Sequence, residues 1–437
     1  MNFRVLSLGC SMHRLLPRVH EKTWHRNNNW QRKDNNKMRR ETWLLPLALL
    51  CVFLSQESAS AATVRAASCS QSDLMTAVNA AGSGDTVQVP GGSATWTATV
   101  SIPNTKGITV DGGTCTVTTN TKAFDVKANN TTTTRITNFR FTSTSTPVYI
   151  NIDGSTSSAT YRVDHNSFNS SDVMISVSGN GPGLIDNNTF HSASRGNEII
   201  HNTGMGASST AGWSDDVMPG SAKMVFIEDN TFTLDINNPN VNTSQPYYFW
   251  GASAVQSYYG ARTVFRHNTL NNMQVDQHGT HGMVGARWWE IYENTFFTGN
   301  GSAQCCYMAI RAGSGVIFNN HHTGTNGADG TISLFEEDTG YPALYQIGRG
   351  INQSISPAYV WGNDADMRVG SGSSNVVEGR DFFGSKPSVF ERAELGSDTS
   401  ATTYAYTPYT YPHPLQNGQP PTQTQINPPT GLTAMVQ

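Results

Sequence analysis

A short polar segment between two apolar stretches holds side chains that can move a proton. Residues 276–282 read Asp-Gln-His-Gly-Thr-His-Gly, so His278 and His281 lie close to a carboxylate in the chain. Histidine changes its charge near neutral pH and is the side chain most often used as a general base or acid. Removing a proton from a carbon beside a carboxylate also requires a cation that neutralises this carboxylate. Arg287 and Arg311 follow the segment and are candidates for that role.

Further candidates come from two stretches with the alternation of a β-strand, in which every second side chain points outward. Arg262, Val264 and Arg266 share one side of the first stretch, and Trp288, Glu290 and Tyr292 share one side of the second. Neighbouring strands lie about 4.8 Å apart, so these side chains could form one surface patch. Arginines that merely pair with neighbouring carboxylates are the structural alternative. The predicted catalytic residues, with a histidine as base and Tyr292 as acid, are His278, His281, Arg266, Arg287 and Tyr292.

Aromatic residues cluster at 247–250 and 258–259. Sugar rings stack on aromatic rings through their apolar C–H faces, although the same aromatic residues could instead pack in a core. The predicted substrate-binding residues are Arg262, Glu290, Arg311, Trp250 and Tyr258. Acidic pairs and triplets at 215–216, 228–229 and 336–338 offer oxygen ligands for Ca²⁺, which is the one cofactor that the sequence leaves open.

A recurring phrase indicates the elements that must position these residues. An apolar residue, two variable residues, Asn, Thr or Ser, and Phe or Leu begin at 163, 185, 227, 265 and 291, and the first half of the phrase returns at 317 and 360. The spacings between the aligned asparagines are 22, 42, 38, 26, 26 and 43 residues, roughly one or two units of a common period. Self-similarity at such a period predicts a solenoid.

The residue types indicate which solenoid this is. Apolar residues recur two apart within a unit, and Thr, Val, Ile, Tyr and Phe alternate with Gly, Asn and Ser, as is typical of short strands and tight turns. A leucine ladder and long helical runs are both absent from the sequence. A coil of parallel strands remains. An Asn at the same turn of each coil can bond to its copies in the coils above and below, which satisfies buried turn amides.

The beginning of this coil resembles that of a known group of proteins. Residues 74–90, from Leu-Met-Thr-Ala-Val-Asn-Ala-Ala to Val-Pro, are similar to the capping helix and first strand of pectate lyase-like proteins. Residues 107–113, Gly-Ile-Thr-Val-Asp-Gly-Gly, resemble their first complete coil. The resemblance covers roughly residues 65–415 and implies an all-β, single-stranded right-handed parallel β-helix with an N-terminal capping helix. The Arg-x-Pro-x-x-Arg signature of pectate lyases is absent, and the fold hosts several functions.

The chain ends outside this coil are of different kinds. Residues 38–61 combine Arg39-Arg40, an apolar run at 44–54 and Ala-Ser-Ala, which predicts a signal peptide cleaved after Ala61 and hence secretion. Residues 1–37 are expected to be a non-structural extension. The β-helix is expected over 62–415, with residues 404–415 along its last coils. A linker and the start of a fibronectin III-like module are expected over 416–437.

Four cysteines follow the predicted cleavage site. In an oxidising compartment Cys69 and Cys115 are expected to form a disulfide near the start of the fold. Cys305 and Cys306 are adjacent, and adjacent cysteines rarely have the geometry for a bond, so we expect two small buried residues there.

Charge limits the partners. The formal net charge of −4 combines about +8 in residues 1–40 with about −10 in residues 62–437. No nucleic-acid partner is expected, because the main body has no basic stripe that could neutralise phosphates. The apolar run at 44–54 is too short to span a membrane, which takes about 20 residues. We expect a monomer with an extracellular polysaccharide as its partner.

Three functions fit these observations. The first is a polysaccharide lyase that cleaves a uronate-containing glycan by β-elimination. The second is a non-catalytic adhesin that displays a glycan-binding face. The third is an inverting hydrolase similar to polygalacturonases, with Asp215 and Asp216 as its carboxylates and His281 near the subsite.

Overall fold

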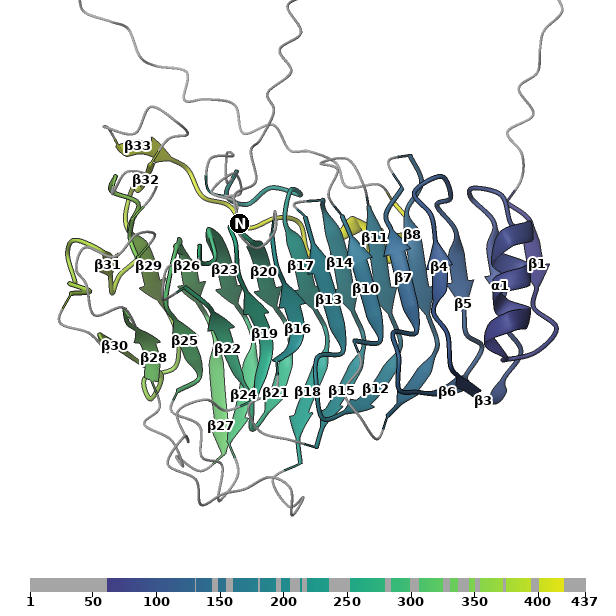
Figure 1. Cartoon of the computed structure of the whole chain (residues 1–437). Helices are drawn as coiled ribbons and strands as arrows, with labels where there is room; N and C mark the ends of the chain where they lie inside the picture. Colours follow the sequence, from purple (N-terminus) through teal and green to yellow (C-terminus); the bar gives the residue numbers. More distant parts are fainter. Residues whose placement is uncertain are drawn as a thin grey trace, which may run out of the picture. The chain divides into compact units, whose positions relative to one another are not determined.

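The computed structural model describes most of the chain after the predicted signal peptide. The described residues are 61–129, 131–143, 148–154, 160–179, 181–193, 198–204, 213, 218–235, 252–279, 284–298, 306–324, 331–336, 346–349, 354–371, 375–393 and 401–419. Within this part, almost every regular element is a short β-strand, and successive strands fall into three sheets in turn. All pairs within these three sheets are parallel, so the chain folds as a parallel β-helix (Figure 1).

The first sheet, here called sheet A, has its strands in chain order. They are β1 (Thr63–Arg65), β2 (Thr86–Gln88), β5 (Thr109–Asp111), β8 (Thr134–Thr137), β11 (Tyr161–Asp164), β14 (Gly183–Asp186), β17 (Val225–Glu228), β20 (Arg262–Arg266), β23 (Trp288–Tyr292), β26 (Ser314–Phe318), β29 (Ala358–Trp361) and β31 (Phe382–Phe383).

The other two parallel sheets follow the same order. Sheet B contains β3 (Gly92–Trp96), β6 (Cys115–Thr119), β9 (Arg140–Thr142), β12 (Ser167–Ser170), β15 (Thr189–Ser192), β18 (Thr231–Leu234), β21 (Thr269–Asn271), β24 (Thr295–Thr298) and β27 (His321–Gly324). Sheet C contains β4 (Val100–Ile102), β7 (Phe124–Lys127), β10 (Ile150–Asp153), β13 (Ile175–Ser178), β16 (Glu198–Asn202), β19 (Ser253–Ser257), β22 (Gln274–Gln277), β25 (Met308–Ile310), β28 (Thr331–Leu334) and β30 (Arg368–Ser371). A small antiparallel pair, β32 (Phe390–Ala393) and β33 (Ala401–Tyr404), follows the last coil.

The repeated phrase forms the turn from sheet A to sheet B. The residue before each ladder asparagine has a φ between 53° and 58°, from His165 to Asn319, which gives the chain a sharp left-handed corner. The side chains of Asn166 and Asn188 each donate to the amide oxygen of the next asparagine in the ladder, at 3.1 Å. The same bond continues through Asn230 to Asn363. The predicted asparagine ladder is therefore confirmed, and it holds each coil at one register.

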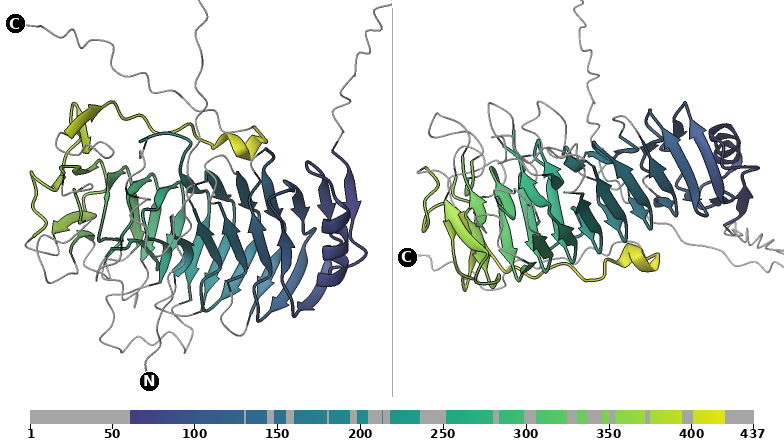
Figure 2. Two further views of the ribbon diagram at one scale, coloured as in Figure 1. Left: turned by 45° about the horizontal axis from the view of Figure 1, so that its top comes forward. Right: turned by 90° about the horizontal axis from the view of Figure 1, so that it is seen from below.

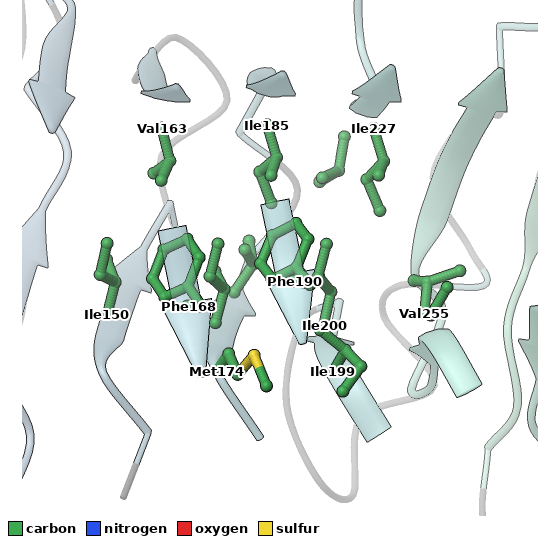
Figure 3. Close-up of a cluster of buried hydrophobic side chains, with 14 of the residues drawn as sticks. Ile150, Val163, Phe168, Met174, Ile185, Phe190, Ile199, Ile200, Ile227 and Val255 are labelled. Carbon is green, nitrogen blue, oxygen red and sulfur yellow. The ribbon is translucent and has the colours of Figure 1, made fainter. Parts of the chain in front are cut away.

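The core lies inside the coil and is built from the same repeat. Phe168 and Phe190 stack with their ring centroids 4.9 Å apart, and Phe190 and Phe232 with theirs 4.7 Å apart. Figure 3 shows isoleucines and valines of sheets A and C, among them Ile185 and Val255, packed around the rings of Phe168 and Phe190 from sheet B. Side chains at equivalent positions thus stack from coil to coil.

The N-terminal end of the coil is covered by α1 (Gln71–Ala80), which was also expected. Ser70 caps this helix by accepting a hydrogen bond from the Asp73 amide at 3.2 Å. Cys69 and Cys115 form the expected disulfide beside the helix. In the described part of the chain, no helix has the length and apolar character of a membrane span.

Cys306 differs from its expectation. It is buried, but it is disulfide-bonded rather than a free small residue, and its partner lies outside the described residues.

A second apolar cluster lies on the outer face of sheet A. Residues 405–419, here called the C-terminal segment, run back across this face and end in a short 3-10 helix, Pro414–Asn417 (Figure 2). Tyr409 and Leu415 of this segment pack against outward side chains such as Phe226 and Trp288. The segment reaches β11, where Arg162 donates to the Leu415 carbonyl at 3.1 Å. It does not stay beside the last coils, as the sequence suggested, because outward apolar residues in the middle coils offer it a surface to bury.

Candidate functional site

The predicted residues of β20 and β23 point outward from sheet A as expected, but the C-terminal segment covers them. Arg266 is fully buried. Its Nε donates to Glu228 at 2.7 Å, one NH group donates to the Tyr292 hydroxyl at 2.8 Å, and the guanidinium also reaches the carbonyls of Tyr409 and Thr410 at 2.6 and 2.9 Å. With the second Glu228 contact at 2.6 Å, each of its five N–H groups has an acceptor. Arg266 thus matches the structural alternative given above, in which an outward arginine pairs with a neighbouring carboxylate.

Glu290 and Tyr292 belong to the same covered network. Glu290 accepts hydrogen bonds from the Gly220 amide, the Trp288 indole and the Tyr406 hydroxyl at 2.7, 3.1 and 2.8 Å. Burial raises the pKa of the Glu290 carboxyl, and burial likewise raises the pKa of Tyr292. Neither side chain reaches a substrate while the segment is in place.

Two further predicted arginines are also buried. Arg262 lies in β20 opposite Trp288. Arg287 lies just before β23, with its guanidinium 5.1 Å from the centre of the Trp213 ring. Arg262, Arg266, Glu290 and Tyr292 therefore lie on sheet A, whereas Arg287 directly follows Ala286, whose amide donates to the His278 carbonyl at 2.9 Å.

His278 instead belongs to a polar group on sheet C. In β16, β19 and β22, His201, Gln256 and Asp276 occupy the same register in adjacent strands. Two predicted residues, Tyr258 and Arg311, also lie in this group. We call it the sheet C cluster, and its members are Glu198, His201, Gln256, Tyr258, Asp276, His278 and Arg311.

The base of the cluster is a buried ion pair. Arg311 donates to both carboxylate oxygens of Asp276, at 3.1 and 2.6 Å, and the exposed fractions of the two side chains are 4% and 3%. A two-pronged bond of this kind fixes the orientation of both groups. Gln256 is also buried and donates from Nε2 to Asp276 Oδ2 at 3.2 Å and to His278 Nδ1 at 3.1 Å.

Four partly exposed groups lie above this base. The rings of Tyr258 and His278 are 4.5 Å apart, centre to centre. The Tyr258 hydroxyl donates to Glu198 Oε1 at 2.9 Å and contacts the amide oxygen of Gln256. His201 contacts the other carboxylate oxygen of Glu198 through Nε2, and its ring meets the Tyr258 ring edge-on at 5.8 Å. Burial, followed by the charge of Glu198, raises the pKa of Tyr258, so this tyrosine keeps its proton.

The cluster can do acid–base chemistry on a bound molecule. His201, Tyr258 and His278 are proton-transfer groups, and none of the three is fully buried. A cation and two carboxylates lie within four successive coils, from β16 to β25. The cluster thus combines on one outer face the types of group that the sequence predicted for the site.

Other predicted residues lie outside the described residues. These are His281, Trp250, the Asp215-Asp216 pair and most of the acidic triplet at 336–338. Glu228 is occupied by Arg266, the His413 amide and Gln416, and Asp229 is occupied by Tyr411 and Gln416. The described side chains contain no group of three or more histidines, cysteines or acids that could hold a metal ion.

Glu198, His201 and Gln256 were not predicted from the sequence. A usable pattern was present, because an inward apolar residue precedes the outward polar one in each strand: Ile200-His201, Val255-Gln256 and Val275-Asp276. Aligning the sheet C strands in the way that the asparagine repeat aligns sheet A would have brought these residues into one row.

Comparisons with known proteins give few matches. No family model matches this chain, and no curated protein matches it. Among solved structures the chain is similar to the PL6 family alginate lyase AlyGC, with a TM-score of 0.29 and 10% identity, and to a point mutant of that lyase, with a TM-score of 0.35 and 11% identity. Each comparison covers 80% of this chain and 57% of the other, so the chain spans little more than half the length of these lyases.

Proposed function

We propose that this chain is a polysaccharide lyase of the pectate lyase-like kind and that the sheet C cluster is its active site. The observation that carries the proposal is the placement of three proton-transfer side chains, all partly exposed, beside the buried Asp276–Arg311 pair. In β-elimination a base removes the proton from the carbon next to the uronate carboxylate. The bond from the next carbon to the glycosidic oxygen breaks, a C=C bond forms, and an acid protonates the leaving oxygen.

The cluster supplies groups for these steps. Tyr258 is the acid, because the raised pKa of its hydroxyl keeps a proton available for the leaving oxygen. A histidine is the base. Arg311 holds Asp276, which in turn accepts from Gln256, so the buried pair fixes the amide that contacts His278.

The substrate is proposed to be an extracellular polysaccharide, and the protein is proposed to be a secreted monomer. The Cys69–Cys115 disulfide supports folding in an oxidising compartment. N-terminal sequencing of secreted material tests cleavage after Ala61, and light scattering tests the monomer. Calcium stays an open cofactor, but the described side chains do not supply a ligand set for it, so no step of the reaction depends on it here.

The experiment is a screen of the secreted chain on polyuronates, including alginate and polygalacturonate, with added Ca²⁺ and with a chelator. Ultraviolet absorbance of the new conjugated double bond is expected with at least one polymer. A variant of the exposed His165 directly after β11, His165→Ala, is the matched control and should act like the wild type. New reducing ends without that absorbance would indicate the hydrolase instead. Binding without cleavage would indicate the adhesin.

A further inference from the structure

We propose that His201, held by Glu198, is the general base of the sheet C cluster, and that His278 is held by Gln256 as a hydrogen-bond donor to the substrate. This assignment rests on the proposed lyase function and departs from the sequence-based choice of His278 or His281. It follows from the contacts that the ring nitrogens of His201 and His278 make with neighbouring side chains.

The contacts of Gln256 determine the state of His278. Asp276, paired with Arg311, can only accept, so the Gln256 atom that contacts Asp276 is the amide nitrogen. The same nitrogen lies 3.1 Å from His278 Nδ1, which must therefore accept. The proton of neutral His278 is then on Nε2, and a ring whose acceptor atom is already occupied is poorly placed to take a proton from a sugar.

His201 is held in a different way. Its Nε2 lies in contact with the Glu198 carboxylate, so we assign the proton of neutral His201 to Nε2 and the lone pair to Nδ1. Among the described residues, no hydrogen bond to His201 Nδ1 is found. Nε2 is buried while the side chain as a whole is 26% exposed, so the exposed part of the ring lies away from Nε2. Glu198 thus orients a base without occupying the basic atom, as in catalytic histidine–carboxylate pairs.

Glu198 also connects this base to the acid. One of its carboxylate oxygens accepts from Tyr258 and the other contacts His201. After elimination, His201 carries the proton from carbon and Tyr258 has lost one to the leaving oxygen. A proton passed from His201 Nε2 to Glu198, and from Glu198 to the tyrosinate, restores the charge of all three groups and leaves the histidine proton on Nδ1. Exchange of that proton with solvent water returns His201 to its starting tautomer. The net change is a proton moved from carbon to oxygen, so the reaction needs no other reactant.

The position of the two groups predicts a class of substrate. His201 lies in β16, and Tyr258 directly follows β19, the adjacent strand, with 5.8 Å between the ring centres. A base and an acid on the same side of the sugar favour removal of a proton and an oxygen that lie on one face of the ring. Mannuronate and glucuronate have C5–H and O4 on the same face, whereas guluronate and galacturonate have them on opposite faces. We therefore expect the former class to be cleaved.

The decisive experiment compares His201→Ala and His278→Ala in the full secreted chain on polymannuronate and on polyguluronate, which differ only at C5. His201→Ala should lower kcat at least about 100-fold, and added imidazole should restore part of the rate, because free imidazole can replace a missing base. His278→Ala should change KM more than kcat and should not respond to imidazole. His201→Gln, which keeps a polar side chain but no base, guards against a folding defect and should be as slow as His201→Ala.

The outcomes separate this assignment from the proposed function. Lyase activity that survives both His201 substitutions, or imidazole rescue of His278→Ala alone, would overturn the assignment and leave the lyase intact. Faster cleavage of polyguluronate would overturn the arrangement of acid and base on one side. A wild-type chain without absorbance change on any polyuronate would overturn the proposed function, and the assignment with it.

Discussion

Replacement of Arg266 tests whether sheet A or sheet C carries the function. Arg266 and Glu228 are both fully buried, and their contacts measure 2.6–2.7 Å. Removing one partner of such a pair leaves a buried charge without compensation, which typically costs about 3–5 kcal/mol. We therefore expect Arg266→Ala to lower the free energy of unfolding by about that amount. The rate of polysaccharide cleavage per folded molecule should stay unchanged.

A matched control and a double variant sharpen this prediction. Arg135 also pairs with a carboxylate on sheet A, but its side chain is 34% exposed, and its partner Asp164 lies near Arg162 as well. Arg135→Ala should therefore cost only about 1 kcal/mol or less. The double variant Glu228→Gln/Arg266→Met removes both buried charges and should recover most of the loss seen with Arg266→Ala.

The assay is urea unfolding followed by circular dichroism, with cleavage rates measured on the same samples below the unfolding transition. If Arg266→Ala abolished cleavage while the unfolding transition stayed in place, Arg266 would act on substrate. The C-terminal segment would then have to leave sheet A during turnover, and the assignment of the site to sheet C would be refuted.

Three further predictions concern stability. Because burial raises the pKa of Glu290 above its usual 4.5, its contribution to stability is complete below that pH and falls as the pH rises toward the folded-state pKa. Glu290→Gln should flatten this dependence in urea unfolding at stepped pH. Asn188→Ala leaves the Asn166 amide without its acceptor and should lower the free energy of unfolding by about 1–3 kcal/mol. The control is Asn169→Ala, at an exposed side chain of sheet B, which should change that free energy by no more than about 0.5 kcal/mol. Replacing Cys69 and Cys115 by Ser opens a link across 46 residues and should cost about 4 kcal/mol, measured in the same way.

The coil itself could be predicted because its signal is local and repeated. A single phrase contains an inward apolar residue, a left-handed corner, a ladder asparagine and a stacking aromatic ring, within six residues. A unit whose phrase is hard to recognise can still be placed from the other units, since the strands of every coil pair with those of its neighbours. The ladder at Asn166 and Asn188 and the ring stack at Phe168 and Phe190 therefore appear where the repeat places them.

The site was harder to predict because it is not local. Glu198 and Gln256 lie in adjacent strands but are separated by a long and irregular stretch of sequence, so the repeat does not align them. The cover on sheet A depends on a contact across 143 residues, between Arg266 and Tyr409. Alternation along a strand predicts correctly that Arg266 points outward. It does not predict what lies on the outer surface.

The polarity of outward residues does distinguish the two faces. On sheet A, the outward row contains Phe226 and Val264, apolar side chains that are fully buried beneath the C-terminal segment. On sheet C, the corresponding outward row contains His201 and Gln256 beside Asp276, and these can hydrogen-bond among themselves or with a ligand. A sheet face with apolar outward residues must bury them against something, whereas a polar face can remain open to a substrate. Val264, between two outward arginines, was therefore already a reason to expect a covered face on sheet A and to look for the reaction on sheet C.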